Sequence, residues 1–347
     1  MGIPSSIDDI TPAWLSTATG WSIDDAAIEQ IGVGIGVSSA LYRVRLTGSG
    51  CPDSVVVKLP ALDDNAVFTS TVLRMYTREA GFFAELADQA PLRVPACHFH
   101  EVDHETSQFV LVLEDLGALR TVDQIEGMAP ADAERAVDGM AKWHATWWGS
   151  GEALAERALT VRVGDDIYKQ VLPLVFPEGW EKLTAELEVP EAIKAVAPKW
   201  VDVFPGILDA LNQEPMTMYH GDFRADNLFF DADGSVAAVD FQLIGSGRAV
   251  YDLAYFVTQS LTPADASAHE KALFDRWVAG LVAAGVAAGD LAEAWDDYRR
   301  TALFCLVYPV VAWRGMDVND PRQKALELAM LDRFSRAVEE LDLADLL

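Results

Sequence analysis

Short apolar stretches dominate the first third of the chain, and longer stretches with helical spacing dominate the rest. Up to about residue 113, hydrophobic residues alternate with polar ones or form brief β-branched runs, a pattern that predicts strands. From Pro130 onward, hydrophobic residues recur with the period of an α-helix. We expect strands at 27–33, 41–46, 54–59, 94–99 and 108–113, and helices at 12–20, 71–87, 131–148, 181–187, 190–211, 249–261, 263–283, 291–313 and 321–341.

A hairpin is predicted between residues 228 and 239. Two apolar runs flank a turn that contains Asp233-Gly234, and an Asp-Gly pair in this setting favours a two-residue hairpin loop. With that loop Asn227 faces Asp240, and facing residues hold their Cβ atoms roughly 5 Å apart. An amide oxygen and a carboxylate at this separation suit Mg²⁺, which prefers oxygen ligands. We therefore expect Asn227 and Asp240 to hold Mg²⁺, while Asp222 on the preceding loop acts on a substrate hydroxyl.

A glycine-rich turn lies between the first two predicted strands. It contains Gly34 and Gly36 and ends in Ser38 and Ser39. Glycines in such a turn let backbone N–H groups approach phosphate oxygens without interference from a Cβ atom. No helix follows this turn, so it is not the fingerprint of a dinucleotide fold. We interpret these four residues as a phosphate-binding loop, with an ordinary hairpin turn as the alternative.

Two charged residues interrupt otherwise apolar patterns. Lys58 stands within the β-branched strand at 54–59, and Glu79 falls in the middle of the apolar stripe of the helix at 71–87. A carboxylate turned toward a core needs a charged or hydrogen-bonding partner, because an isolated buried charge is costly. We expect Lys58 and Glu79 to form an ion pair. The alternative is a lysine on an edge strand and a glutamate on the surface.

The overall composition excludes several classes of protein. The 347 residues suffice for two domains or lobes, and 51% of them are hydrophobic. The net charge is 26 − 54 = −28, which disfavours nucleic-acid binding because phosphate backbones require a basic surface. No apolar run is long enough to span a bilayer, and no secretory signal pattern is visible. The three scattered cysteines favour reduced thiols, so we expect a cytoplasmic protein.

An ordered set of motifs resembles a known superfamily. His220-Gly221-Asp222 is followed after four residues by Asn227, then by the predicted hairpin and Asp240-Phe241-Gln242, and then by Asp252 within Tyr251–Phe256. This combination resembles the aminoglycoside phosphotransferase and choline kinase superfamily, and it is most similar to the ecdysteroid-kinase-like branch. The resemblance implies an α+β, two-lobed, protein-kinase-like fold. Residues 1–116 would form a small N-lobe with an antiparallel sheet, and residues 117–347 a larger, mainly helical C-lobe.

The resemblance also implies roles for individual residues. ATP would bind between the lobes, with its triphosphate under the Gly34 loop and near Lys58. The backbone around Glu114 and Leu116 would contact adenine. Asp252 would brace the catalytic loop without touching substrate. From its place two residues after Asp222, we expect Arg224 to steady the transferring phosphate, and we expect Asp222 to accept a proton or a hydrogen bond from the acceptor hydroxyl.

Several functions compete on these motifs. The first is transfer of phosphate to a small-molecule alcohol. The ecdysteroid-kinase-like resemblance and the tryptophan-rich second half favour a bulky apolar acceptor, with antibiotic and choline-type kinases as alternatives. A nucleotide-binding pseudokinase or scaffold is a second class. A protein kinase is disfavoured because His-Gly-Asp replaces His-Arg-Asp and Gln242 stands where glycine usually follows Asp-Phe. Residues 149–213 carry no motif, and their aromatic residues, Trp180, Trp200 and Phe204, serve either an acceptor pocket or core packing.

Overall fold

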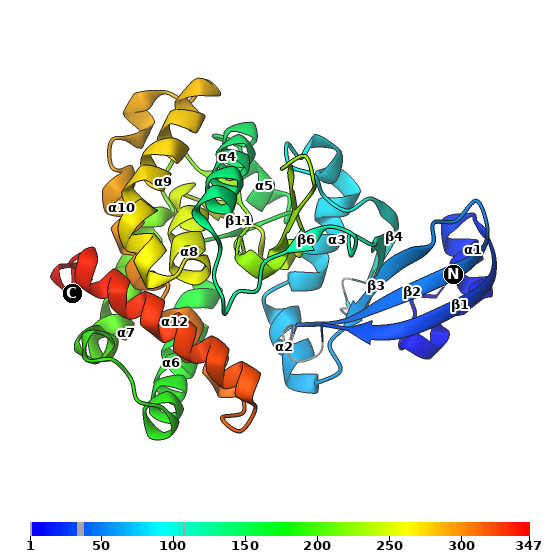
Figure 1. Cartoon of the computed structure of the whole chain (residues 1–347), viewed down its shortest axis with the longest axis horizontal. Coiled ribbons are helices and arrows are strands. Elements are labelled where there is room, and N and C mark those ends of the chain that lie inside the picture. The colour runs from blue at the N-terminus through cyan, green and yellow to red at the C-terminus, as the bar shows by residue number, and fades with distance from the viewer. Residues whose placement is uncertain (1, 33–37, 104, 107) are drawn as a thin grey trace. The chain divides into compact units, whose positions relative to one another are not determined.

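A computed structural model describes residues 2–32, 38–103, 105–106 and 108–347 of the chain (Figure 1). Two compact units are present. The first unit comprises Met1–Arg120 together with Ala237–Leu243, and the second comprises Thr121–Val236 together with Ile244–Leu347. The short segment around Asp240 therefore belongs to the first unit, although it follows more than a hundred residues of the second. Gly34 and Gly36 of the expected phosphate loop lie outside the described residues.

The first unit is built on one antiparallel sheet with the strand order β1-β2-β3-β5-β4. The register places Tyr42 of β2 opposite Val57 of β3, and Val57 opposite Val112 of β5. Alternate residues of β2 are buried, as expected for a strand with one face on a core. All five strands were predicted, although β1 begins five residues earlier than expected and β4 begins three residues later. The strands are β1 (Ser22–Ile31), β2 (Ser39–Ser49), β3 (Ser54–Pro60), β4 (Cys97–Val102) and β5 (Phe109–Glu114).

The helices of the first unit follow from their caps. The predicted first helix is confirmed as α1 (Pro12–Thr19), with Thr11 accepting from the Trp14 N–H and Gly20 ending the helix at φ 77°. The single helix predicted at 71–87 is confirmed only for its central residues, 75–85. The chain instead forms α2 (Asp64–Val72) and α3 (Met75–Glu85), and Arg74 between them has a left-handed φ of 55°.

An aspartate at the end of β5 ties three segments of the first unit together. Asp115 accepts from Arg43 Nε at 2.6 Å, from Ser54 Oγ at 2.8 Å and from the Gly117 N–H at 2.9 Å. Burial tends to raise the pKa of Asp115, but these hydrogen bonds outweigh burial and hold the pKa below its ordinary value of 3.8. Because the folded state has the lower pKa, the ionised carboxylate stabilises the fold.

We expect the stabilisation by Asp115 to disappear in acid. Asp115→Asn should be less stable than the wild type near neutral pH. This difference should shrink as the pH falls below 3.8 and through the lowered pKa, because both forms of the residue are then uncharged. Urea unfolding of both proteins across that range measures the difference. A difference in unfolding free energy that stays constant down to the acid end would contradict this assignment.

The second unit is mainly helical and has its core around buried tryptophans. Trp143, Trp200, Trp277 and Trp313 are all at most 1% exposed. In Figure 1, α4 and α9 lie side by side, and their contacts are among the most extensive between helices. The helices are α4 (Pro130–Thr146), α5 (Gly151–Glu156), α6 (Asp166–Glu186), α7 (Glu191–Leu211), α8 (Val250–Ser260), α9 (Pro263–Ala283), α10 (Ala294–Phe304), α11 (Val307–Ala312) and α12 (Pro321–Glu340).

Two helix predictions in the second unit differ from the structure. The helix expected at 181–187 is the last part of α6, which begins at Asp166 and contains Pro173 and Pro177. Proline is normally excluded from helix interiors, so the sequence pattern hid the first part of this helix. The helix expected at 291–313 is divided into α10 and α11. Trp200 stacks between Phe176 and Phe204, and all three are buried, so these side chains serve core packing.

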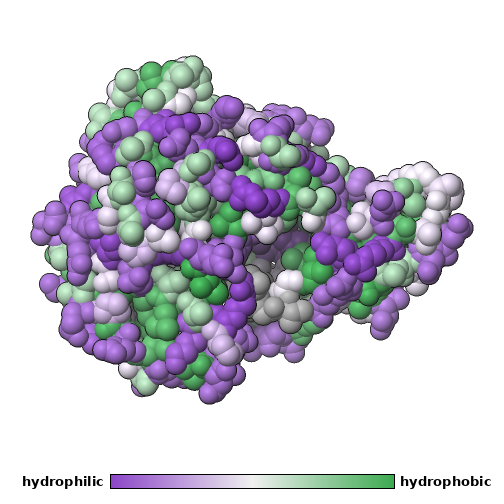
Figure 2. Space-filling model, viewed as in Figure 1, coloured by the Kyte–Doolittle hydropathy of each residue, from purple (hydrophilic) through white to green (hydrophobic). Residues whose placement is uncertain are grey.

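Short strands complete the architecture. Strands β7 (Val161–Arg162), β11 (Gly245–Gly247) and β8 (Thr217–Tyr219) form one small sheet in the second unit. Another sheet has the order β10-β9-β6. Hydrophilic residues cover most of the visible face of the helical unit, with hydrophobic residues scattered among them (Figure 2). Among the described residues, no helix combines the length and apolar character needed to cross a membrane. The short strands are β6 (Arg120–Thr121), β9 (Leu228–Phe230) and β10 (Val236–Ala238).

Candidate functional site

The predicted hairpin is present, but its loop has three residues and not two. The Asp231 N–H donates to the Ser235 carbonyl at 3.0 Å, and the Gly234 N–H donates to the Asp231 carbonyl at 3.0 Å. Gly234 has a φ of 86°, the left-handed conformation that a three-residue loop with a glycine bulge requires. The predicted pairing of Asn227 with Asp240 is therefore wrong. The strands β9 and β10 cover only Leu228–Phe230 and Val236–Ala238, so the ladder stops before either residue.

The first unit contains a buried charge cluster of Lys58, Glu79 and Asp240. Lys58 Nζ lies 2.8 Å from Glu79 Oε2 and 2.9 Å from Asp240 Oδ1, which confirms the predicted pairing of Lys58 with Glu79. Burial by itself would lower the pKa of Lys58, but the two carboxylates together raise it, so the ammonium stays charged. Burial raises the pKa of Glu79 to about 7. The Lys58 ammonium is therefore a fixed positive charge next to the Asp240 carboxylate, and the Asp240 side chain is 32% exposed.

The residues after Asp240 lock this segment into the first unit. Asp240 itself has a φ of 66°, an uncommon conformation for a residue other than glycine. The Phe241 ring stacks on Phe82 of α3 with centroids 3.9 Å apart, and the Phe241 N–H donates to Glu79 Oε1 at 3.2 Å. These contacts hold Asp240 next to Lys58 by packing on one side and by a backbone hydrogen bond on the other.

Gln242 connects the same segment to the two serines of the expected phosphate loop. The Ser38 hydroxyl donates to Gln242 Oε1 at 2.7 Å, and Gln242 Nε2 donates to Ser39 Oγ. The Ser38 carbonyl also accepts from the Tyr76 hydroxyl at 2.8 Å. Ser38 and Ser39 are thus held at the beginning of β2, while their binding to phosphate remains a prediction.

The expected adenine-contact residues stand at the end of β5. The Glu114 carboxylate accepts from Arg93 Nη2 at 2.8 Å and from the Ala96 N–H at 3.1 Å, so its side chain is engaged within the first unit. The Leu116 side chain is 5% exposed, and its carbonyl accepts from the Leu119 N–H at 2.9 Å. Within the described part of the chain, no acceptor lies within reach of the Leu116 N–H. Contact with adenine by these two residues remains a prediction.

In the second unit, Asp252 holds the His-Gly-Asp loop through backbone hydrogen bonds. The Asp252 carboxylate is fully buried and accepts from the His220 N–H at 2.7 Å and the Gly221 N–H at 2.8 Å. It also lies 3.0 Å from His144 Nε2, and Trp277 Nε1 donates to His144 Nδ1 at 3.0 Å. Because the indole N–H of Trp277 can only donate, Nδ1 of His144 acts as the acceptor and carries no proton. The proton of the neutral ring therefore lies on Nε2, which faces the Asp252 carboxylate. The expected bracing role of Asp252 is confirmed, and His144 is a buried core residue with both ring nitrogens engaged.

The Asp222 carboxylate receives three donors. Tyr255 Oη donates to Oδ1 at 2.5 Å, Arg224 Nε donates to the same oxygen at 3.0 Å, and Asn227 Nδ2 donates to Oδ2 at 2.7 Å. Asn227 Nδ2 also donates to the Asp222 carbonyl at 2.9 Å. Asn227 lies in the 3₁₀ turn Ala225–Asn227 directly before β9, so this turn, and not the strand ladder, brings it to Asp222.

Tyr255 is a contact that the sequence pattern did not predict. It lies three residues after Asp252 in the quoted Tyr251–Phe256 motif, and that spacing on a helix is the signal that could have indicated it. Arg224 was predicted to steady phosphate. In the structure its guanidinium donates to Asp222, to Asp226 at 3.2 Å and to Gln124. Its role toward phosphate remains a prediction.

Asn227 in the second unit and Asp240 in the first each carry an oxygen that suits a hard divalent cation. The Asn227 amide nitrogen is committed to Asp222, and among the described residues no donor reaches the amide oxygen. Asp240 supplies a carboxylate whose charge Lys58 partly offsets. Both are oxygen ligands of the kind that Mg²⁺ prefers. Over the described ranges, no group of three or more His, Cys, Asp or Glu side chains gathers as a metal cluster, and the binding of Mg²⁺ by Asn227 and Asp240 remains a prediction.

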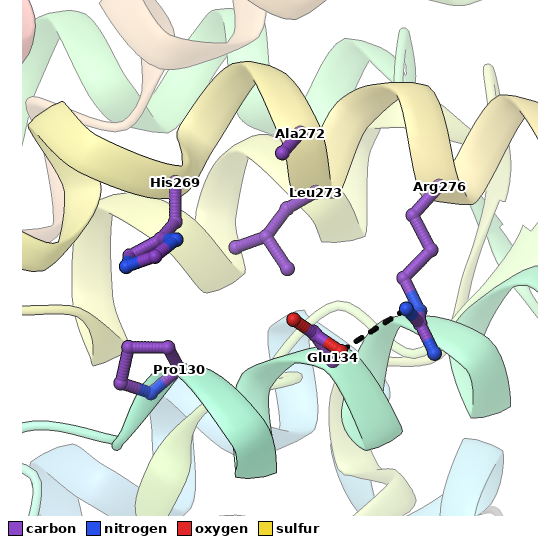
Figure 3. Close-up of a pocket in the computed structure, with 6 residues that line it drawn as sticks. All are labelled: Pro130, Glu134, His269, Ala272, Leu273 and Arg276. Atoms are coloured by element: carbon purple, nitrogen blue, oxygen red, sulfur yellow. Dashed lines mark hydrogen bonds and ion pairs between the residues drawn. The ribbon is translucent and has the colours of Figure 1, made fainter.

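A separate small cavity lies between α4 and α9 in the second unit (Figure 3). Its volume is about 90 Å³, well below the several hundred Å³ typical of a ligand pocket. In Figure 3 Arg276 reaches across it to Glu134, and none of its lining residues belongs to the candidate site. The lining residues are Pro130, Glu134, His269, Ala272, Leu273 and Arg276.

Together the fold and the site define the class of protein. A sheet-containing unit carries a buried Lys–Glu pair, and a helical unit carries a braced His-Gly-Asp loop, which is the two-lobed protein-kinase-like fold. The chain belongs to the ecdysteroid kinase-like family, whose model matches residues 36–285. No curated protein matches the sequence.

Solved structures of small-molecule kinases have the same fold. A choline kinase from Cryptosporidium parvum Iowa II has a TM-score of 0.59 and 9% identity, covering 98% of this chain and 95% of that one. The macrolide 2'-phosphotransferase MphH from Brachybacterium faecium has a TM-score of 0.50 and 15% identity, covering 97% and 99%. An aminoglycoside phosphotransferase in complex with GDP and kanamycin has a TM-score of 0.60 and 12% identity, covering 93% and 97%. At these identities the likeness shows the fold alone.

Proposed function

We propose that this protein transfers the γ-phosphoryl group of ATP to a hydroxyl of a small molecule, with Mg²⁺ as the cofactor. The observation that carries the proposal is the buried Lys58 ammonium held between Glu79 and Asp240. Burying an ammonium costs desolvation free energy, and an ion pair with a carboxylate repays little more than that cost, so stability alone does not explain this lysine. A buried ammonium does suit the binding of a triphosphate. Membership of a kinase-like family supports the same reaction.

Each residue of the candidate site has a role in this reaction. Lys58 binds phosphate oxygens, and Glu79 keeps it oriented. Asn227 and Asp240 supply the oxygen ligands that would hold Mg²⁺, which when bound neutralises the charge developing on the transferred group. Asp222 accepts a hydrogen bond from the acceptor hydroxyl and aligns it for in-line attack. The backbone near Leu116 binds adenine, and the loop containing Gly34 and Gly36 covers the phosphates.

We propose a bulky apolar alcohol as the acceptor. The family to which the chain belongs is named after ecdysteroid kinases, and this name fits an acceptor of this kind. Trp200 and Phe204 no longer support it, because they lie in the core. An antibiotic or choline-type acceptor is the alternative, since structural neighbours with those names have the same fold.

The decisive experiment is ADP formation from ATP in a coupled assay, with a library of alcohols as acceptors. We expect one class of alcohol to stimulate ADP release, and we expect EDTA to abolish it because the phosphate charge is then not neutralised. Thermal-shift screening with Mg²⁺ and a non-hydrolysable ATP analogue would select the alcohols to test. Binding of the analogue without any ADP release, with every acceptor and with water, would favour a pseudokinase or scaffold over the proposed enzyme.

A further inference from the structure

Helix α8 holds the catalytic loop at two points on one face. Asp252 fixes the backbone of the loop through the N–H groups of His220 and Gly221, and Tyr255 reaches the side chain of Asp222. Residues three apart on a helix lie on the same face, so both contacts come from one rigid surface. Every residue of α8 is buried, which leaves this helix little freedom to move.

We propose that Tyr255 is a positioning residue that makes Oδ2 of Asp222 the oxygen that engages the acceptor hydroxyl; this inference rests on the proposed function. A carboxylate oxygen offers about two acceptor sites. Oδ1 already receives Tyr255 Oη and Arg224 Nε, whereas among the described residues Oδ2 receives only Asn227 Nδ2. One site on Oδ2 therefore remains for a substrate, and the contacts to Oδ1 fix the direction in which that site points.

The Tyr255 hydroxyl is suited to remain a donor. Its side chain is 4% exposed, and its ring packs edge-on against Tyr308 with centroids 4.5 Å apart. Burial and the charge of Asp222 raise the pKa of Tyr255 well above its ordinary value, so the phenol stays protonated over the range in which the enzyme would work. The 2.5 Å separation is that of a charge-assisted O–H···O⁻ bond, which is stronger than a bond between neutral groups.

A matched control exists in the same aromatic cluster. Tyr308 is half-buried, its ring packs against that of Tyr255, and its hydroxyl bonds to that of Tyr251. Tyr308→Phe and Tyr255→Phe each remove one hydroxyl from one cluster and keep the ring. Only Tyr255→Phe removes a hydrogen-bond donor from the Asp222 carboxylate, so a difference in activity between the two variants reports on Asp222.

The test measures ADP release from Mg·ATP with water as the acceptor, for the wild type, both single variants, Asp222→Asn, and the double variant Asp222→Asn/Tyr255→Phe. We expect Tyr255→Phe to lower kcat by about 10- to 100-fold, because a misdirected catalytic group loses much of its effect. The KM for ATP should not change, since the Tyr255 hydroxyl donates to Asp222 and not to a residue proposed to bind ATP. Tyr308→Phe should stay within about twofold of the wild type, a change within the scatter expected of a neutral substitution.

The double variant separates positioning from a general structural role. If Tyr255 acts through the carboxylate, then Tyr255→Phe should cause no further loss in the Asp222→Asn background. An equal loss in both backgrounds, or full turnover in Tyr255→Phe, would overturn the inference while leaving the proposed function intact. No ADP release from the wild type with water or any alcohol would overturn the proposed function, and the inference with it.

Discussion

Asp222→Asn is expected to lower the rate of phosphoryl transfer by about 10²- to 10⁴-fold, the range usually attributed to a general base, and to leave ATP binding unchanged. The variant keeps the shape of the side chain but loses one of its two acceptor oxygens. Tyr255 and Arg224 donate to one end of the carboxylate, and Asn227 donates to the other. An amide can accept at only one end, so its NH₂ group must face a donor at the other, and the site for the acceptor hydroxyl is lost.

Asp226 offers a matched control for this substitution. It is a carboxylate of the same loop that accepts from Arg224 at 3.2 Å and from the Gln124 N–H at 3.1 Å, and neither of these hydrogen bonds involves Asp222. Asp226→Asn should therefore retain turnover within a few-fold of the wild type, apart from any loss of stability. Isothermal titration with an ATP analogue and a coupled ADP assay measure binding and turnover separately. Undiminished turnover in Asp222→Asn would rule out its assignment as the group that engages the acceptor.

Local sequence pattern was sufficient where one segment decides its own structure. The strands of the first unit and helices such as α9 and α12 follow from apolar spacing and from caps such as Thr262 and Asp320. The pairing of Lys58 with Glu79 was also predictable from single residues. Each stood in an apolar environment that a lone charge could not tolerate, so each needed the other.

The pattern failed where two local structures share the same signal. Asp233-Gly234 is compatible with a two-residue loop and with a three-residue loop that ends in a left-handed glycine, and the choice shifts the register of everything beyond. The predicted neighbours of Asn227 were wrong for this reason. Its partner is Asp222, reached through a 3₁₀ turn, which apolar periodicity does not reveal.

Long-range contacts account for the remaining differences. Nothing within Ala237–Leu243 indicates that it packs with the first unit, because the cause is Phe241 stacking on Phe82 and Asp240 meeting Lys58, more than 150 residues earlier in the chain. Tyr255 was hidden in a similar way. It lies in a helix that is buried on all sides, where an aromatic residue is expected for packing, so only its spacing of three residues from Asp252 could have indicated the contact of its hydroxyl.

Asp240→Asn is expected to weaken binding of Mg·ATP by about 10- to 100-fold, or about 1.4 to 2.7 kcal/mol, because a hard cation loses an anionic ligand. Asparagine is preferred to alanine for this test. Asp240 has a φ of 66°, which asparagine tolerates and alanine does not, so the variant changes the charge without adding backbone strain. Glu79 remains within 2.8 Å of Lys58 and keeps the ammonium paired in the variant.

The comparison that isolates the cation is the binding of a non-hydrolysable ATP analogue with and without Mg²⁺. In the wild type, Mg²⁺ should strengthen binding, since it offsets the repulsion between the triphosphate and Asp240. In Asp240→Asn that strengthening should be largely lost, whereas binding in EDTA should be equal to or tighter than that of the wild type, because a negative charge near Lys58 has been removed. If Mg²⁺ strengthened analogue binding equally in both proteins, Asp240 would not be a ligand of the cation, and its contact with Lys58 would be structural only.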